Sequence, residues 1–245
     1  MIALKVPHSE THTPKFAELS AGCFAHPSGA LWLPQQAAAA VGGLAMADGT
    51  RRAEVRAAAL QVDSIALLQR LLHELHPRLI VLSSPIAASP QIFPFIRDEL
   101  RQRLAPLLAA ARIVVVDAEV EMWRAIGLEA SPAFRELPLS VLSEAPAARP
   151  PLDGVLVPGP WHPVVSIGGS SETLHRLPAF LVYPGAILLP AVSAAAPTFD
   201  LGRGLPPALA SLAANRPAEA FALRRGQFLP LGRLNLRPRA PRPGR

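Results

Sequence analysis

Apolar runs and helical patterns alternate through the first half of the chain, and this alternation restricts the fold more than any other feature. The run "GLAMAD" (43–48) predicts a short buried strand that ends in a carboxylate. A helical pattern follows over 54–75, where apolar residues recur every three or four positions. Further strands are predicted at 78–82 and 112–117, with a second helix over 92–110 between them. This order predicts a parallel sheet with right-handed crossovers.

After Pro138 the pattern changes to short apolar runs separated by Gly/Pro turns, with no room for helices. Each of "LSVLS", "GVLV", "VVSI", "AFLVY" and "AILLP" predicts a strand. Near the other end, "CFAHPSGALWLP" (23–34) predicts a hairpin around Pro27-Ser28-Gly29. The predicted fold class is α/β, with a βαβαβ front half and a β-rich back half.

The length of 245 residues predicts one domain, over 20–223, with an N-terminal extension over 1–19. Residues 224–245 contain seven arginines and no acid, so this segment has a charge of +7. Because the net charge of the whole chain is +6, the charges of the other residues sum to 6 − 7 = −1. We expect a flexible Pro/Arg-rich tail. Its arginines are candidates for contact with nucleic-acid phosphates. The candidates are Arg233, Arg237, Arg239, Arg242 and Arg245.

Three features predict a cytoplasmic protein that does not enter a membrane. Residues 1–10 lack the pattern of a signal peptide. The apolar stretch 179–196 imitates a membrane span, but prolines and a glycine divide it into two runs of strand length. Cys23 is the sole cysteine, which excludes an intrachain disulfide and a cysteine-based zinc site.

Polar side chains follow the predicted strands at their carboxyl ends, where ligands gather in open α/β sheets. The end "MADGT" contains Asp48 and Thr50, and the end "VLSSPIA" contains Ser83 and Ser84. The later ends supply Asp117, Ala118 and Glu119 in "VVDAEVE", Glu144 in "VLSEAP" and His162 in "VPGPWHP".

The order of these segments resembles the calcineurin-like metallophosphoesterases, and within them the small bacterial branch associated with DNA repair and ligases. "GPWHPVVSIGGSSETLHRLPAFLVYPGAILLPA" is similar to that branch's Gly-His-x-His-Pro segment and the two strands that follow it. "RLIVLSSPI" is similar to the strand that ends in Gly-Asp, and "ALWLPQQ" to the opening hairpin. The resemblance spans about residues 20–205. It implies a metallophosphoesterase-like β-sandwich with flanking helices and a two-metal phosphoesterase site.

Most positions that hold metal ligands in that family carry other residues here. The resemblance places Asp48 at the family's first aspartate, but Thr50 stands where its histidine partner belongs. Ser83-Ser84 replaces Gly-Asp, which removes the carboxylate that bridges the two metals. The other replacements are Ala118 and Glu119 for Asn-His, Glu144 for the lone histidine, and Pro160 for the first histidine of Gly-His-x-His. His162 alone survives from that last motif, so the resemblance implies a vestigial metal site.

The sequence leaves three functions open. The favoured one is a scaffold or binding subunit that has lost catalysis and cofactor, with DNA or DNA-repair proteins as partners. The second is an active phosphodiesterase or nuclease that holds manganese or another divalent metal in a rearranged, carboxylate-rich site. Its ligands would be Asp48, Asp117, Glu119, Glu144 and His162. The third is a metal-free hydrolase that uses Ser83 or Ser84 with a histidine, although "LSSP" lacks the Gly-x-Ser-x-Gly elbow.

Overall fold

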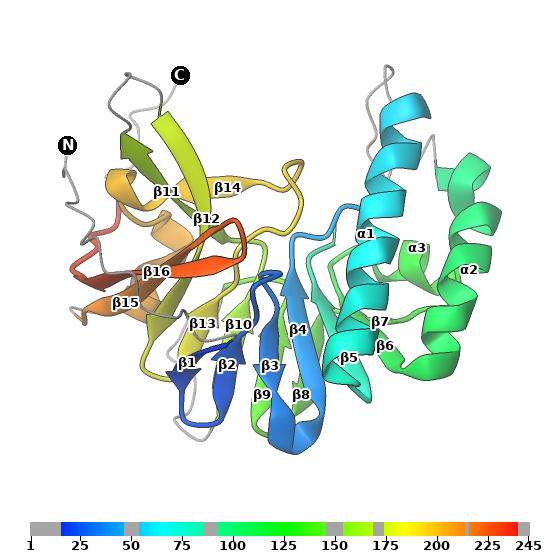
Figure 1. The fold of residues 1–245 in the computed structure, drawn as a ribbon, viewed down its shortest axis with the longest axis horizontal. Coiled ribbons are helices and arrows are strands. Elements are labelled where there is room, and N and C mark those ends of the chain that lie inside the picture. The colour runs from blue at the N-terminus through cyan, green and yellow to red at the C-terminus, as the bar shows by residue number, and fades with distance from the viewer. Residues whose placement is uncertain are drawn as a thin grey trace.

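The structure is a computed structural model that describes residues 16–46, 54–85, 93–145, 154–168, 174–213 and 216–239. Figure 1 shows the strands in the centre, the longest helices on one side and the strands of the C-terminal half on the other. The two longest helices are α1 (Glu54–Leu75) and α2 (Phe93–Ala110). The shorter ones are α3 (Val120–Arg124), α4 (Ala210–Ala213) and the 3-10 turns η1 (Pro34–Gln36), η2 (Leu201–Arg203) and η3 (Pro207–Leu209).

Seven strands of the described chain form the first sheet, in their order along the sequence. They are β1 (Ala17–Ser20), β2 (Cys23–Ala25), β3 (Leu31–Leu33), β4 (Ala38–Gly42), β5 (Leu79–Ser83), β6 (Arg112–Val116) and β7 (Glu129–Ser131). Strands β1 to β4 are antiparallel neighbours, and β4 to β7 are parallel. The predicted hairpin and the predicted parallel sheet are therefore both confirmed.

Nine described strands form the second sheet, in the order β14-β11-β12-β13-β10-β9-β8, with β15 paired to β12 and β16. They are β8 (Ala133–Glu136), β9 (Leu139–Leu142), β10 (Val155–Pro158), β11 (His162–Gly168), β12 (Leu174–Tyr183), β13 (Ala186–Leu188), β14 (Thr198–Asp200), β15 (Ala218–Arg224) and β16 (Gln227–Leu234). The short strands predicted from the apolar runs are present. The short helices η2, η3 and α4 are also present, although the spacing of the runs predicted none.

Apolar side chains fill the spaces on both faces of each sheet. Leu82 of β5 packs toward the helices with Leu68 of α1, whereas Val81 packs toward the second sheet with Phe180 of β12. A third cluster covers the outer face of the second sheet beneath η2, η3 and α4. Strands buried on both faces read as unbroken apolar runs, which is why 78–82 and 112–117 were identifiable from the sequence.

The first parallel strand lies five residues earlier than predicted. It is the run "AAAVG" of β4, in which all five residues are buried, and not "GLAMAD". Alanine is depleted in strands, so a run of small residues gives a weak strand signal. Gly43 has φ +58° and ends the strand. Residues 47–53, which include Asp48 and Thr50, lie outside the described part of the chain.

The predicted tail begins inside a paired strand. Arg224 ends β15, and β16 pairs with β15 along its whole length. Phe228 is buried, with its ring centroid 6.5 Å from that of Phe180. Beyond the hairpin, the guanidinium of Arg239 donates to the backbone carbonyls of Asp200, Arg203 and Gly204 at 3.2, 2.9 and 3.1 Å. Residues 224–239 therefore belong to the domain.

The N-terminal boundary of the domain lies close to its predicted position. The domain was predicted to begin at residue 20, and β1 covers Ala17–Ser20. No helix of the described chain is both long enough and apolar enough to cross a membrane.

Candidate functional site

Strand ends from both sheets meet at one place. At the ends of β4 and β5, the Gly43 amide donates to the Ser83 carbonyl at 3.1 Å. The Gly159 amide, in the loop between β10 and β11, donates to the carbonyl of Leu142 at the end of β9 at 2.8 Å. A Cβ placed on Gly159 would meet the hydroxyls of Ser83 and Ser84. The sequence predicted this convergence of Ser83, Ser84 and the loop before His162.

The ring of His162 is packed directly on the end of β4. A Cβ on Gly42 would lie 2.9 Å from His162 Cε1, and one on Gly43 would lie 2.9 Å from His162 Nε2. Only glycine allows the ring to approach the backbone this closely. His162 is the first residue of β11, whereas the sequence placed it in the loop after "GVLV".

His162 is held as a neutral imidazole. Its side chain is 2 % exposed, and Nδ1 donates to the carbonyl of Leu189 at 3.1 Å. This bond puts the ring proton on Nδ1, so Nε2 carries a lone pair. No described residue forms a hydrogen bond with Nε2. Burial lowers the pKa of His162 to about 4, and the bond to Leu189 opposes this shift.

The lowered pKa predicts a specific loss of stability in mild acid. Because the pKa of His162 is about 4 in the folded state and 6.5 for an unperturbed histidine, the unfolded chain takes up a proton first as the pH falls. His162 therefore stabilises the fold fully above pH 6.5 and progressively less down to about pH 4. We expect this group to lower the free energy of unfolding by about 2 kcal/mol between pH 7.5 and 5.

Urea unfolding at these two pH values measures this loss. The His162→Gln variant should lack this part of the pH dependence, whatever its own stability. His175→Gln, which removes an exposed histidine, is the matched control and should keep the full dependence. Equal pH dependence in wild type and His162→Gln would contradict the prediction.

The two serines at the end of β5, Ser83 and Ser84, differ in their exposure and backbone conformation. Ser83 is 2 % exposed, and its hydroxyl has no hydrogen-bond partner among the described residues. Ser84 is half-buried and has φ +47°, in the left-handed region. With His162 Nδ1 bonded to Leu189, these residues show no serine–histidine hydrogen bond of the kind that the third hypothesis requires.

The carboxylates predicted for a rearranged site have other surroundings. Asp117 accepts from the Glu119 amide at 3.2 Å and from Trp123 Nε1 at 3.0 Å, so it fixes the start of α3. Glu119 and Glu144 are exposed. Within the described chain, no three His, Cys, Asp or Glu side chains come together in a group that could hold a metal ion. The described donors therefore do not fit a two-metal centre, which needs several ligands for each ion.

Glycines were the part of this site that the sequence analysis missed. Gly42, Gly43 and Gly159 are the positions at which backbone lies against the side chains of His162, Ser83 and Ser84. The available signal was the Gly-Gly pair that directly follows a run of small apolar residues, since glycine marks close approach of the backbone to another group.

Two packed mixed sheets, with the two long helices on the outer face of the first, form an α/β fold, as predicted. Among solved structures, the chain is similar to that of Pseudomonas putida nuclease MPE, with a TM-score of 0.57 and 15 % sequence identity. The match covers 88 % of this chain and 98 % of the nuclease chain. No family model matches the sequence, and no curated protein matches it. At this identity the likeness concerns the fold.

Proposed function

We propose that this protein is a nucleic-acid-binding scaffold built on a metallophosphoesterase-type fold, without metal-dependent phosphodiester hydrolysis. The observation that carries this proposal is the position of His162. Its ring is buried, bonded to Leu189 and packed against Gly42 and Gly43. A histidine in this state supports the ends of the strands, and the likeness to a nuclease fold favours DNA as the partner.

The described ligand candidates support the non-catalytic part of the proposal. A metal-activated water needs an ion held by several fixed ligands. Ser83, Ser84 and Ala118 stand at three of the strand-end positions. Serine hydroxyls are weak neutral ligands, and alanine has no side-chain atom that could bind a metal. The carboxylate of Asp117 is occupied by Trp123 and by the amide of Glu119.

We expect purified protein to show no manganese-dependent turnover of bis(p-nitrophenyl) phosphate or of single-stranded DNA. The physical reason is that an ion held by too few ligands neither acidifies a water nor stabilises the charge of the transition state. Metal content by mass spectrometry and the hydrolysis rate with added manganese measure this directly. Cleavage that needs manganese and disappears in Asp48→Asn or Glu119→Gln would instead establish the rearranged catalytic site.

The arginines near the C-terminus divide into two groups. Arg239 bonds to backbone carbonyls, and Arg233 lies 3.5 Å from a carboxylate oxygen of Glu219, so both have structural partners. Arg224, Arg225 and Arg237 are exposed, the first two at the turn between β15 and β16. These three are the better candidates for phosphate contacts. Arg242 and Arg245 lie outside the described residues.

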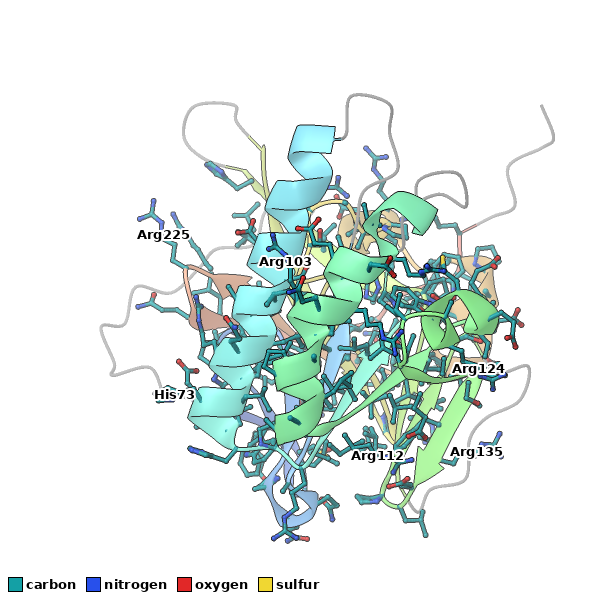
Figure 2. All side chains as sticks on the ribbon, turned by 90° about the vertical axis from the view of Figure 1, so that its right-hand side faces the viewer. His73, Arg103, Arg112, Arg124, Arg135 and Arg225 are labelled. Carbon is teal, nitrogen blue, oxygen red and sulfur yellow. The ribbon has the colours of Figure 1, made fainter. Side chains whose placement is uncertain are left out.

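Three arginines on the side of the molecule that carries α1 and α2 have acidic neighbours. Figure 2 shows Arg103, Arg112 and Arg124 on this side, with Arg225 apart from them. Arg103 pairs with Glu99 at 2.7 Å and Arg124 with Glu121 at 2.9 Å. Arg112 lies between Glu129 and Glu136, at 2.7 and 2.5 Å. These carboxylates offset the positive charge, so we place the nucleic-acid surface on the β15–β16 hairpin, with Arg224 and Arg225 at its turn and Arg237 beyond the end of β16.

Replacing Arg224, Arg225 and Arg237 together by alanine is expected to weaken DNA binding and to reduce its salt dependence. Each lost phosphate contact lowers the slope of log K against log salt by about one unit. Fluorescence anisotropy with a labelled oligonucleotide over a salt series measures both quantities. Arg103→Ala, which removes an ion-paired arginine, should bind as the wild type does. An unchanged slope in the triple variant would remove this surface from the proposal.

A further inference from the structure

Three polar side chains outside the strand-end site are connected in a row. His26 follows β2 and is 2 % exposed. Its Nδ1 lies 2.8 Å from the hydroxyl of Ser28, and its Nε2 lies 3.0 Å from a carboxylate oxygen of Glu74 near the end of α1. Phe16 packs on the ring, with centroids 5.5 Å apart. The histidine thus joins a serine of the first hairpin to a carboxylate on the longest helix.

The backbone determines which nitrogen carries the proton. The amide N–H of Ser28 points to His26 Nδ1 at 3.3 Å, and an amide is always a donor. Nδ1 therefore accepts, and the ring proton is on Nε2, which lies 3.0 Å from the carboxylate of Glu74. The Ser28 hydroxyl, 2.8 Å from Nδ1, is then the second donor to the same lone pair. A serine that donates to a histidine with a carboxylate beside its other nitrogen is the arrangement that activates serine nucleophiles.

The turn holds Ser28 in a fixed position. The Gly29 amide donates to the His26 carbonyl at 2.9 Å, and the His26 amide donates to the Ala30 carbonyl at 2.8 Å. Gly29 has φ +90°, and a Cβ there would lie 3.1 Å from Val192 Cγ1. The turn is therefore pressed against the segment that follows β13. A rigid support of this kind is what keeps a nucleophile and its base within hydrogen-bond reach.

Ser28 lines a groove of about 370 Å³ between this turn, α1 and the segment after β13. The groove is large enough for a small organic molecule. Leu44 and Leu67 form part of its apolar lining, and α1 adds one charge of each sign, from Arg70 and from Asp63 seven residues before it. Arg70 is exposed and has no ion-pair partner among the described residues. A small substrate with an apolar part, and with an anionic group at Arg70 and away from Asp63, matches this lining.

We propose that Ser28, His26 and Glu74 form a serine esterase site that cleaves small carboxylic esters whose anionic group is bound by Arg70. This activity is independent of the nucleic-acid binding proposed above. Ser28 is the nucleophile and His26 is the base. Glu74 is a positioning residue, whose carboxylate 3.0 Å from Nε2 stabilises the tautomer in which Nδ1 accepts.

In each half of the reaction, His26 Nδ1 takes up one proton from the attacking group and gives it to the leaving group. Ser28 Oγ bonds to the carbonyl carbon of the ester while its proton passes to His26 Nδ1. The bond from this carbon to the alcohol oxygen breaks, and the leaving alkoxide takes the proton from Nδ1. A water then attacks the acyl-serine, gives its proton to Nδ1 and releases the acid, and Ser28 recovers its proton. No oxidant, metal or further reactant is needed.

A fluorophosphonate probe tests the proposal on the full-length protein. The Ser28 oxygen displaces fluoride from phosphorus, so mass spectrometry should find the adduct on the peptide that contains Ser28. Ser28→Ala, which removes one oxygen, should give no adduct. His26→Asn should label at least one hundredfold more slowly, since general bases contribute about a hundredfold or more. Ser166→Ala is the matched control, because Ser166 bonds to the carboxylate of Asp200 without a histidine.

Two further measurements separate catalysis from a structural role of the same residues. Glu74→Gln should slow labelling and change its pH profile, and Glu74→Asp should restore part of the rate. The wild type should prefer mono-p-nitrophenyl succinate to p-nitrophenyl butyrate in kcat/KM, and Arg70→Ala should remove this preference. A wild type that is not labelled at Ser28, or that is labelled equally fast in His26→Asn, overturns the proposal. The three residues would then only anchor the hairpin to α1.

Discussion

Replacing Gly43 by alanine is expected to lower the free energy of unfolding by about 3 kcal/mol. Gly43 has φ +58°, which is unfavourable for any residue with a Cβ. The added methyl would also lie 2.8 Å from the Cβ of Ala196 and 2.9 Å from His162 Nε2. Both neighbours are buried, so neither moves aside without disturbing the strand ends. Equilibrium unfolding in urea measures the loss.

Gly22→Ala provides the matched control for this prediction. Gly22 also has a positive φ, +73°, but nothing lies within 4 Å of its Cβ position. Its replacement should lower stability only by the backbone strain, about 1 kcal/mol. In a double-mutant cycle, His162→Ala should reduce the effect of Gly43→Ala, because the two positions are in contact. Equal effects of alanine at Gly22 and Gly43 would show that the ring does not press on β4.

Deleting residues 224–245 is expected to lower the melting temperature by more than about 10 °C or to prevent folding. The deletion removes β16 entirely and leaves β15 as an edge strand that pairs only with β12. It also removes Phe228, which is buried between the two sheets. Losing a buried phenylalanine alone lowers the free energy of unfolding by about 3 to 5 kcal/mol, and each kcal/mol shifts the melting temperature of a chain of this size by about 2 to 4 °C.

The contrast with a shorter deletion is the decisive measurement. A chain that ends at Arg239 keeps the hairpin and the bonds from Arg239 to Asp200, Arg203 and Gly204. We expect it to melt within a few degrees of the wild type in a calorimetric scan. Phe228→Ala should lie between the two deletions. If all three chains melted together, residues 224–239 would be a tail, as their composition suggested.

The sequence predicted the parts of the candidate site that lie at strand ends. It did not predict the parts that depend on close contacts between the backbone and a side chain. The runs 78–82 and 112–117 are apolar throughout because β5 and β6 are buried on both faces, so their ends at Ser83 and Asp117 could be located. Parallel strands place such ends at one edge, which brought Ser83, Ser84 and His162 into one hypothesis. The roles of Gly42 and Gly43 were not visible, because a glycine does not show in the sequence which ring it touches.

The carboxylates show a second reason why the sequence predicted only part of the candidate site. Asp117, Glu119 and Glu144 all follow strands, so their positions along the chain are equivalent to those of ligands. Whether a carboxylate faces a site or a neighbouring donor depends on the direction of one side chain. For Asp117 the indole of Trp123 and the amide of Glu119 decide this direction. These partners are close to Asp117 in the chain, but nothing in the sequence distinguishes them from ordinary helix residues.

By itself the sequence determined the fold class, the parallel order of β5 and β6 and the two long helices, because burial of one or both faces leaves a periodic apolar pattern. Only the tertiary structure decided that residues 227–234 pair with β15 as a strand, that His162 packs on Gly42 and Gly43, and that His26 lies between Ser28 and Glu74. Arg233 within β16 and the arginines before and after this strand conceal its apolar residues from a composition count. Contacts such as that between His26 and Glu74 join residues far apart in the chain, and their chemistry exists only once the sheets and helices have packed.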